Sequence, residues 1–391
     1  MVSDDRAIVL DAEQRSSLAV TRSLGRGGIA VTSADTSTPT LSSRSRYSQT
    51  SRTYPDPSSE PSAFIASLAA LGPFTEPPVL VACTDASVPV VNDSALLRGL
   101  YRTCLPPAAG YAQLSDKWTL HELAEACGVA VPATWRLAPK VRHLGDIPRD
   151  IDLLVVKPRQ SVQEFAGKRA KLPVLQLKRA QLEAALAEDL YPEEADLLVQ
   201  RPVAGWGMGV CVVCDRGSVV AWFAHRRLRE KPPWGGVSVL CESIPVPPRL
   251  RDQCVKLVEA TQWHGPAMFE FKMTDDGQAN LIEVNGRLWG SVQLAIDCGV
   301  DVPLMMFRLA RGERIETTAG YAIGRRMRWL LGDLSHLYMV LRRRGVGAAG
   351  RSRLSTLYDV LLARSPNTSI EDWRYGDFGP FRHQLAAELR L

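Results

Sequence analysis

Apolar and polar positions in the first third of the chain alternate between two periods. Residues 7–12 (AIVLDA), 29–35 (IAVTSAD) and 78–85 (PVLVACTD) are short apolar runs typical of buried strands. Residues 15–24 and 63–71 carry apolar positions at helical spacing instead. This strand–helix–strand–helix–strand order predicts a parallel sheet covered by helices.

The first predicted strand runs into the first helix at three polar residues, which are Glu13, Arg15 and Ser16. Ligands of parallel sheets bind at the carboxyl ends of the strands. These residues are therefore candidates for substrate contact, although helix capping alone would also explain a serine there.

The pattern changes near residue 116. Residues 116–129 (DKWTLHELAEACGV) predict an amphipathic helix that opens on Lys117, and residues 153–159 (LLVVKPR) predict a buried strand that carries Lys157. Further strands are predicted up to residue 246, and Arg-rich helical segments follow residue 325.

Residues 269–287 (FEFKMTDDGQANLIEVNGR) predict a hairpin, because Asp276-Gly277 favours a two-residue type I′ turn. That turn pairs Asp275 with Gln278, which in turn places Glu270 directly opposite Glu283. Phe269 then opposes Val284 and Phe271 opposes Ile282 on the other face, an apolar core seam. The polar face carries the two glutamates and Asn285.

Like charges that lie directly opposite in a sheet are unfavourable, so the glutamate pair needs compensation. A hard divalent cation with oxygen ligands would provide it. Screening by water at a solvated hairpin edge is the alternative, and the hairpin alone does not decide between the two.

Composition narrows the possible functions. The 391 residues have 46% apolar content and a formal net charge of +5, too small to indicate nucleic-acid binding by the whole protein. The eight cysteines are scattered without a zinc-site pattern, which favours buried reduced thiols. The sequence shows no signal peptide and no apolar run long enough to span a bilayer, so we expect a cytoplasmic protein.

Four features occur in a telling order along the chain: Lys117, Lys157, the GGVS loop at residues 235–238, and Glu270 followed by Glu283-Val-Asn285-Gly-Arg287. Together they resemble the ATP-grasp superfamily, and the resemblance covers most of the chain. Within the superfamily, the sequence is most similar to predicted carboxylate–amine ligases related to the large subunit of carbamoyl-phosphate synthase.

The resemblance implies a combined α/β and α+β architecture. Residues 1–112 would form a parallel α/β pre-ATP-grasp domain, residues 113–192 and 193–320 the two nucleotide-clamping lobes, and residues 321–391 a helical Arg-rich extension.

The resemblance also implies roles for single residues. Glu270, Glu283 and Asn285 would hold Mg²⁺, or Mn²⁺ in its place, and the two glutamates would thereby contact ATP through the metal. Lys117 and Lys157 would reach the α- and β-phosphates as point charges.

The same resemblance places the adenine against the strand that ends at Gln200, with backbone groups of Arg201 and Val203 reading the base edge. Many relatives carry an acidic residue directly after this glutamine, and Arg201 departs from that pattern. In the loop at residues 159–172, Gln160, Ser161 and Lys168 are candidates for phosphate contact.

Arg287 would present its guanidinium to the transferring phosphoryl group and to the acyl phosphate, although a structural ion pair with a nearby acid is the alternative. The carboxylate substrate needs a cationic anchor, for which Arg226, Arg227 and His225 are candidates, unless they form only a solvated strand end. Trp206 and Trp234 are candidates for walls of the substrate site.

The leading hypothesis is an ATP- and Mg²⁺-dependent ligase that joins a small carboxylate to an amine, both amino-acid-like, through an acyl phosphate. One alternative is a carboxylase or carbamoyl-transfer enzyme that uses bicarbonate; the other is a degenerate ATP-grasp module that only binds nucleotide. The sequence does not decide the oligomeric state, although homodimers are common among the relatives that the resemblance implies.

Residues 320–391 hold 12 arginines, no lysine and six acidic residues. Such a charge run is usually a solvated face. The alternative for Arg342-Arg343-Arg344 is contact with an anionic membrane surface or with a polyanion.

Overall fold

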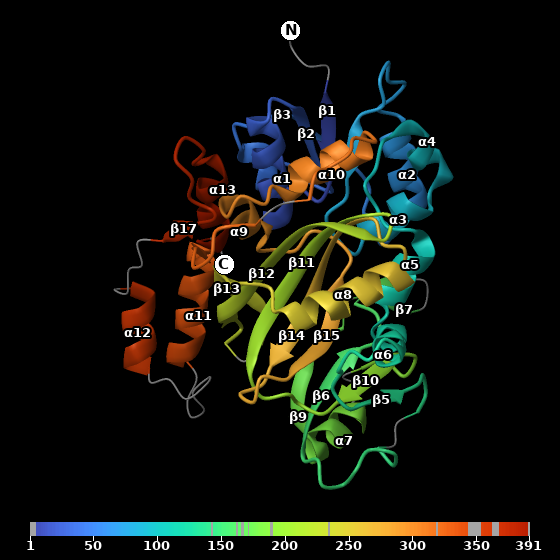
Figure 1. Cartoon of the computed structure of the whole chain (residues 1–391), viewed down its shortest axis with the longest axis vertical. Helices are drawn as coiled ribbons and strands as arrows, with labels where there is room; N and C mark the ends of the chain where they lie inside the picture. Colours follow the sequence, from blue (N-terminus) through green and yellow to red (C-terminus); the bar gives the residue numbers. More distant parts are fainter. Residues whose placement is uncertain are drawn as a thin grey trace.

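The computed structural model describes residues 5–389, apart from residues 142–143, 162, 166–167, 171, 188–190, 234, 318–319, 343–352 and 362–366. Three sheets follow one another down the molecule, with the N-terminal sheet at the top of Figure 1, the largest sheet in the middle and a smaller sheet at the bottom.

The N-terminal sheet is parallel, as its pattern predicts. Its strand order is β3-β2-β1-β4, and Ile8 of β1 pairs with Thr32 on one side and with Leu80 on the other. The strands are β1 (Arg6–Val9), β2 (Ala30–Asp35), β3 (Ser48–Thr53) and β4 (Val79–Val81). The accompanying helices are α1 (Arg15–Arg26), η1 (Ser42–Arg44), α2 (Pro61–Ala69), α3 (Ser87–Asp93), α4 (Ala95–Leu100) and α5 (Ala108–Ser115).

The small sheet is antiparallel, with the order β5-β10-β6-β9. Its strands are β5 (Thr134–Leu137), β6 (Leu153–Pro158), β9 (Leu175–Lys178) and β10 (Leu197–Gln200). They accompany α6 (Lys117–Ala126), α7 (Arg179–Ala187) and a two-stranded ribbon of β7 (Gln163–Phe165) and β8 (Lys168–Ala170).

The large sheet has seven strands in the order β15-β14-β11-β12-β13-β16-β17. They are β11 (Trp206–Asp215), β12 (Ser218–Lys231), β13 (Val237–Ser243), β14 (Gly265–Met273), β15 (Ala279–Asn285), β16 (Arg326–Arg328) and β17 (Thr368–Ile370). The remaining helices are α8 (Pro248–Ala260), α9 (Val292–Asp297), α10 (Val302–Ala310), α11 (Leu330–Arg342), α12 (Arg353–Leu361) and α13 (Gly379–Glu388).

Both faces of the large sheet are buried. Val210 and Phe269 belong to one hydrophobic cluster, whereas their strand neighbours Cys211 and Met268 belong to another. This follows from the alternation of side chains along a strand. The eight cysteines are free thiols, and all but Cys127 are buried.

The C-terminal segment joins two of the sheets. Its strands β16 and β17 extend the large sheet, and Asp377 forms a buried 2.6 Å ion pair with Arg22 of α1.

The strand β10, which begins at Leu197, pairs within the small sheet. The exact domain boundaries remain a prediction.

The turn of the β14–β15 hairpin differs from the prediction. A type I′ turn requires positive φ at both Asp276 and Gly277, but of these two only Gly277 has it, at 81°. The Thr274 N–H donates to the Gln278 carbonyl at 2.9 Å, so three residues, 275–277, form the loop. The predicted two-residue turn is therefore wrong by one residue.

A β-bulge at Ile282 compensates for the longer turn. Phe271 pairs with Leu281, not with Ile282 as predicted, and the register shifts between Glu270 and Phe271. The extra residue on β15 restores the predicted pairing beyond the bulge, where Glu270 lies opposite Glu283 and Phe269 opposite Val284. The glutamate pair therefore depends on the bulge as well as on the turn.

Candidate active site

The centre of the candidate site is the glutamate pair on β14 and β15. Asn285 lies two residues beyond Glu283 on the same strand, and its Nδ2 donates to Glu283 Oε1 at 3.3 Å. Burial raises the pKa of Glu270, and the Glu283 charge adds to that rise while Arg227 opposes it. Burial alone would also raise the pKa of Glu283, but four cations outweigh it and lower the pKa: Lys117, Lys157, Arg227 and Arg287. Glu283 is the carboxylate that this environment keeps ionised.

A glycine of β11 gives Arg227 access to Glu270. A Cβ atom on Gly207 would lie 3.1 Å from the Arg227 Cδ atom, whereas one on Gly209, which lies opposite Glu270, would collide with the His225 ring. With hydrogen in place of a side chain at Gly207, Arg227 crosses β11 and forms a direct ion pair with Glu270. Arg227 also pairs with Glu230 at 3.2 Å. The alternating glycines of the GWGMG segment thus have a structural reason.

Lys157 approaches the pair from the small sheet. Its Nζ atom donates to the Ile282 carbonyl at 3.2 Å, the carbonyl of the bulged residue. Burial lowers the pKa of Lys157 to about 8, with Lys117 lowering it further and the two glutamates opposing. The bulge thus brings the small and large sheets together at the glutamates.

Lys117 begins α6 and is buried. The Asp116 carboxylate caps this helix by accepting from the Trp118 N–H at 3.0 Å and the Thr119 N–H at 3.1 Å. Arg159 also pairs with Asp116, at 2.7 Å. With its backbone held in this way, Lys117 donates from Nζ to the Ser161 hydroxyl at 3.2 Å.

Arg287 lies in the segment after β15, acts on Glu283 through its charge, and pairs with Asp85 at 2.9 Å. Asp85 follows β4, at the carboxyl end of the N-terminal parallel sheet, and the Tyr111 hydroxyl donates to its other oxygen at 3.5 Å. Burial alone would lower the pKa of Arg287, but Asp85 raises it. A second nitrogen of the Arg287 guanidinium, Nη1, donates to the Leu288 carbonyl at 3.1 Å.

The strand predicted to bind adenine is β10. Gln200 is buried, and its Nε2 donates to the Thr134 hydroxyl at 2.8 Å. The Arg201 N–H already donates to the Ala133 carbonyl at 2.9 Å, so this group cannot also donate to a base. The Arg201 side chain is exposed, and Val203 is half-buried.

Arg226 is not brought to the glutamates. It neighbours Arg227 on β12, so its side chain lies on the opposite face of the sheet, where it pairs with Glu242 at 2.7 Å. Of the two arginine candidates for the carboxylate anchor, only Arg227 therefore lies beside Glu270, because the pleat separates them.

His225 is buried, and its Nε2 lies 3.3 Å from the Ser291 hydroxyl oxygen. Burial lowers the pKa of His225 to about 3, so the side chain is neutral and cannot be the cationic anchor that the sequence suggested.

Other sequence candidates lie at the edge of the site or beyond it. Trp206 is exposed and Ser16 is buried, and the Glu13 carboxylate accepts from the Leu41 N–H at 2.9 Å. Arg15 pairs with Glu371 at 2.5 Å, and its guanidinium lies 4.2 Å from the Trp329 ring centroid.

In the loop at residues 159–172, which was expected to contact phosphate, Gln160 donates to Asp116 at 3.4 Å. Trp234 and the side chain of Lys168 lie outside the described residues.

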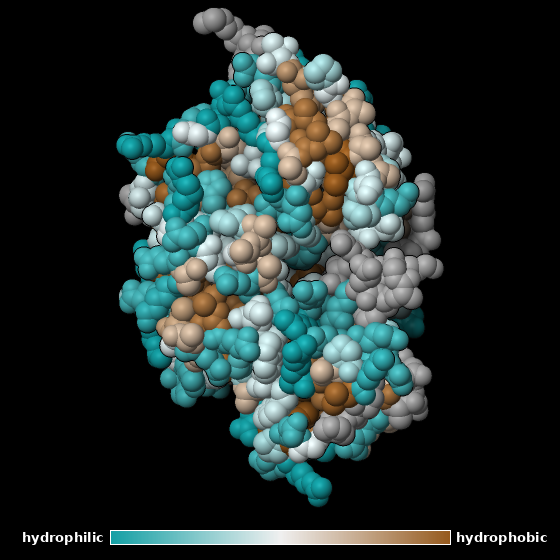
Figure 2. Space-filling model, turned by 90° about the vertical axis from the view of Figure 1, so that its right-hand side faces the viewer, coloured by the Kyte–Doolittle hydropathy of each residue, from teal (hydrophilic) through white to brown (hydrophobic). Residues whose placement is uncertain are grey.

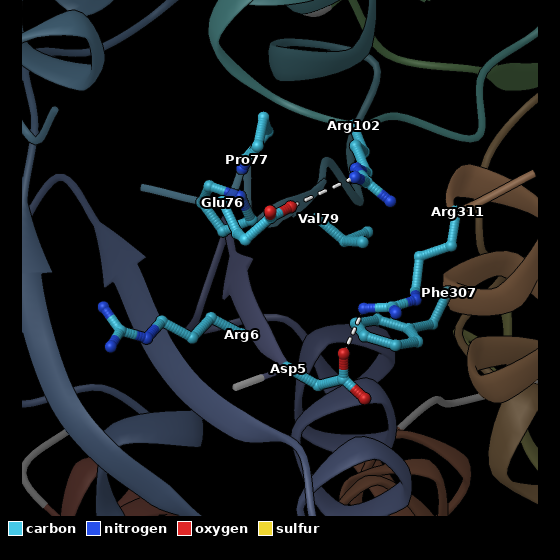
Figure 3. A pocket seen from close by; sticks show the side chains of 9 residues that line it. Asp5, Arg6, Glu76, Pro77, Val79, Arg102, Phe307 and Arg311 are labelled. Carbon is cyan, nitrogen blue, oxygen red and sulfur yellow. Dashed lines mark hydrogen bonds and ion pairs between the residues drawn. The ribbon is translucent and has the colours of Figure 1, made fainter. Parts of the chain in front are cut away.

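A cavity of about 470 Å³ lies at the other end of the N-terminal sheet, near the amino ends of β1 and β4 (Figure 3). Its charged groups pair with one another: Arg102 with Glu76 at 3.4 Å, and Arg311 with Asp5. It contains none of the predicted site residues, and parallel sheets bind ligands at their carboxyl ends. It is not the candidate site.

Comparison with known proteins agrees with the fold. Residues 193–330 match the family model described as "ATP-grasp in the biosynthetic pathway with Ter operon". None of the curated proteins matches the sequence. The fold is similar to the L-amino acid ligase of Bacillus licheniformis (TM-score 0.60, 15% identity, 80% of this chain and 75% of that chain).

Two further solved structures have the same fold. The biotin carboxylase domain of the Hydrogenobacter thermophilus 2-oxoglutarate carboxylase, crystallised with MgADP and bicarbonate, has a TM-score of 0.63 at 14% identity over 82% of this chain and 73% of that chain. The N5-carboxyaminoimidazole synthetase of Staphylococcus aureus has a TM-score of 0.60 at 12% identity over 83% and 82%. The chain has the ATP-grasp fold.

The donor set of the candidate site fits a magnesium ion. Glu270, Glu283 and Asn285 offer hard oxygen ligands on neighbouring strands, and Mg²⁺ needs only a few protein oxygens when phosphates and water complete its coordination. Within the described ranges, no group of three or more His, Cys, Asp or Glu residues could hold a metal without such help. Arg227 contacts Glu270 in this structure, so metal at Glu270 would have to share or displace that contact.

Asp85 and Glu230 are the site residues that the sequence did not reveal. Asp85 lies four residues beyond the end of β4, as Glu13 lies four residues beyond the end of β1, so the rule that pointed to Glu13 would also have pointed to Asp85. Glu230 had no such signal, because its role comes from Arg227 on the same long strand.

Proposed function

We propose that this protein is an ATP- and Mg²⁺-dependent ligase that joins a small carboxylate to an amine. The observation that carries the proposal is the half-buried Glu270–Glu283 pair, with Asn285 beside it and with Lys117, Lys157 and Arg287 lowering the pKa of Glu283. If the two glutamates had only a structural role, one neighbouring cation such as Arg227 would be enough to compensate their repulsion. A triphosphate and its metal ion need the several cations and the oxygen ligands that gather here.

The chain's own residues have distinct tasks in this proposal. Lys117 and Lys157 come from the segment that carries the small sheet and neutralise the phosphates of ATP. Mg²⁺ held by Glu270, Glu283 and Asn285 would add charge neutralisation at the β- and γ-phosphates.

Arg287 supports the transfer itself. A carboxylate oxygen of the acid substrate attacks the γ-phosphorus, ADP leaves, and an acyl phosphate forms; the amine then attacks the acyl carbon and phosphate leaves. Asp85 and Leu288 hold Nε and Nη1 of Arg287. The remaining Nη2 donates to the oxygens where negative charge gathers.

Arg227 is the cation best placed to receive the acid substrate. It lies on the same face as Glu270 and is bound to the loop after β12 through the Gly236 carbonyl, at 3.2 Å. In the proposal, Arg227 exchanges its contact with Glu270 for the substrate carboxylate once the metal is bound.

The test is phosphate release from Mg·ATP across a panel of amino acids, supplied singly and in pairs, with mass-spectrometric identification of products. A ligase releases phosphate when an acid and an amine are both present and forms a product lighter than their sum by one water. Phosphate release that depends on bicarbonate would support a carboxylase instead. Nucleotide binding without phosphate release from any pair would refute the proposal in favour of a binding module.

A further inference from the structure

The contact between Arg15 of α1 and Glu371, directly after β17, is only partly paired. Arg15 Nη1 donates to Glu371 Oε2 at 2.5 Å. The Glu371 side chain is 3% exposed, and its second oxygen, Oε1, is buried without a hydrogen-bond partner in the described part of the chain. Arg15 donates to described acceptors through Nη1 alone, although a guanidinium has several further N–H donors. Buried carboxylate oxygens normally have a partner, so the contact leaves a place for a cationic group.

A second ion pair between the same two segments is complete. Arg22 Nε donates to Asp377 Oδ2 at 2.6 Å, and the Ser45 hydroxyl donates to the same oxygen at 2.9 Å. The Arg46 N–H donates to Asp377 Oδ1 at 2.8 Å. This pair joins α1 to the C-terminal segment with every carboxylate oxygen bound, so the open oxygen of Glu371 is not required for that joint.

Glu371 lies on the face of the large sheet that also carries Arg227. Cys241 of β13 pairs with Arg227 of β12. Met327 of β16 pairs with Cys241 on one side and with Ser369 of β17 on the other. The Glu371 N–H continues the pairing of β17 by donating to a β16 carbonyl at 2.9 Å. Because paired residues, and residues two apart on one strand, point to the same face, Glu371 shares the face of the proposed acid anchor.

The charges of Arg15, Glu371 and Arg227 all act on one buried group, the Cys241 thiol. Burial raises the pKa of Cys241 to about 12, the Glu371 charge adds to the rise, and the charges of Arg15 and Arg227 oppose it. Coulomb interactions weaken with distance. The partly paired contact and the proposed acid anchor therefore both lie close to this thiol.

Arg15 also packs against the segment that carries Arg287. A Cβ atom on Gly290, three residues after Arg287, would lie 3.0 Å from Arg15 Nη2. The strands β1 and β4 are neighbours in the N-terminal sheet, and the chain beyond them provides Arg15 and the Arg287 partner Asp85. The carboxyl edge of one sheet thus holds both arginines, Arg15 directly and Arg287 through Asp85.

Trp329, directly after β16, holds the Arg15 guanidinium by stacking. The Arg15 Cζ atom lies 4.2 Å from the ring centroid, and the Lys231 Nζ atom lies 5.3 Å from the same centroid. The Trp329 Nε1 atom is buried without an acceptor in the described ranges. Because an indole N–H is a donor only, the ring offers a further donor beside Arg15.

The C-terminal segment lies where the N-terminal and large sheets meet. In Figure 1, α13 and β17 are on the left, near α1 and α9. Figure 2 shows the opposite side of the molecule, where hydrophobic residues form several separate patches among hydrophilic ones. None of the helices among the described residues is long and apolar enough to cross a membrane.

The unpaired groups fit a ligand of mixed charge. Burial raises the pKa of Glu371, Arg15 opposes that rise, and Asp372 adds to it. A cation beside Oε1 would favour the ionised carboxylate. A simple anion would be repelled by the two acids, and a simple cation by Arg15. An α-amino acid has both charges: an ammonium group for Glu371 and a carboxylate for Arg15 and Trp329.

We propose that Arg15 and Glu371 form the subsite for the amine substrate, and that this substrate is an α-amino acid. Its ammonium group binds Glu371 Oε1, and its carboxylate binds the free donors of Arg15 and the Trp329 Nε1 atom. The inference rests on the proposed ligase function and deepens it. A residue of the C-terminal segment, outside the 193–330 range of the family match, then selects one of the two substrates.

Two reactions of the full-length enzyme test the proposal. Hydroxylamine traps an acyl phosphate as a hydroxamate, so hydroxamate formation measures the ATP-dependent half of the reaction without an amino acid in the subsite. Amide formation is measured with the amino acid that serves best as the amine in the panel above, and with its α-amide, which keeps the ammonium group but lacks the carboxylate. The wild type should have a KM at least about tenfold lower for the amino acid than for its amide.

Arg15→Gln removes the partner of the carboxylate. The KM for the amino acid should rise about 10- to 100-fold, whereas the KM for the amide should change by less than about twofold. Glu371→Gln removes the partner of the ammonium group, so the KM for both amines should rise by a similar factor. Hydroxamate formation should be unchanged in both variants.

Asp377→Asn is the matched control, because it weakens the other ion pair between the same two segments and should leave both KM values unchanged. Ser369→Ala, which removes a hydroxyl donor to Asp297 at 2.7 Å, is a milder control on β17. Circular dichroism establishes that each variant is folded, and the comparison of the two amines in the wild type requires no variant.

Equal KM values for the amino acid and its amide in the wild type would overturn the proposal. An equal rise in KM in Asp377→Asn and in Glu371→Gln would also overturn it, because the contact would then be a structural joint. In both cases hydroxamate formation by the wild type would leave the ligase function intact. A wild type that forms no hydroxamate from any acid would refute the ligase function and the subsite with it.

Discussion

Two clusters of charge in this protein, one buried and one half-buried, differ in how completely they are paired. Asp333 is fully buried, and both of its oxygens are bound: Arg229 contacts both at 2.7 and 2.5 Å, and Arg328 forms a further ion pair at 2.6 Å. At the other cluster, Glu283 has no direct ion pair among the described residues, although four cations lower its pKa. The first cluster is a closed structural joint, and the second retains oxygens for a ligand.

The comparison shows how to separate structural from functional charge. A closed cluster stabilises the folded state because each buried charge has a fixed partner. Removing one partner leaves the other charge buried without compensation, which lowers the free energy of unfolding. An open cluster gains its partners only when the ligand binds. Substitutions in the two clusters should therefore affect different measurements.

The largest expected effect is on turnover at the open cluster. Glu283→Gln removes one oxygen charge from the metal position, and ATP consumption should fall by about 10²- to 10³-fold, the order seen when one electrostatic contact to the reacting group is lost. The control is Glu242→Gln, which alters a carboxylate on the opposite face that pairs with Arg226. Similar activity in both variants would contradict the distinction.

Asp333→Asn should act on stability instead. It leaves Arg229 and Arg328 without a buried counter-charge, so the free energy of unfolding should fall by about 3–5 kcal/mol. Denaturant titration measures the loss, and ADP affinity measured below the unfolding transition should be unchanged. A stable Asp333→Asn protein with impaired nucleotide binding would place Asp333 in the functional cluster.

The sequence predicted most of the architecture because its strands and helices follow clear periodicities. It also predicted the Glu270–Glu283 pairing, but through two local errors that cancel: the turn is one residue longer, and Ile282 forms a bulge. A bulge has no reliable sequence signal, since it depends on contacts between segments, here between Lys157 and the Ile282 carbonyl.

Which arginine side chains lie in the site could not be predicted either, because their positions also depend on contacts between segments. Arg226 and Arg227 have the same local chemistry, and only the pleat decides which one reaches Glu270. The Asp85–Arg287 pair joins residues 202 positions apart, so no local pattern links them.

A smaller effect is expected from Asp85→Asn, which tests whether the open cluster extends to the N-terminal sheet. The amide cannot hold the Arg287 guanidinium as firmly, and misplacement of that group should lower kcat by about 10- to 100-fold. ADP affinity should be unchanged, because Asp85 contacts Arg287 and Tyr111, not a phosphate-binding lysine. Tyr111→Phe, which loses only the 3.5 Å hydroxyl contact, should have the milder effect.

The smallest expected effect is on pH dependence. With a pKa of about 8 in the folded protein, Lys157 loses its proton above that pH, and ADP affinity should decline by at most about tenfold per pH unit. The unfolded chain keeps this proton up to the ordinary lysine pKa, so between these two values the unfolded state binds more protons and stability rises with pH. Lys157→Met should remove both trends; retention of both would assign them to another group.

The most direct test of the central claim is divalent-cation binding, measured by the electron paramagnetic resonance of free Mn²⁺ in the presence of ADP. The wild-type protein and Glu242→Gln should both remove Mn²⁺ from solution, whereas Glu270→Gln and Glu283→Gln should not, although both remain folded. If the two glutamate variants bind Mn²⁺ as tightly as the wild type, the hairpin is not the metal site and the account is contradicted.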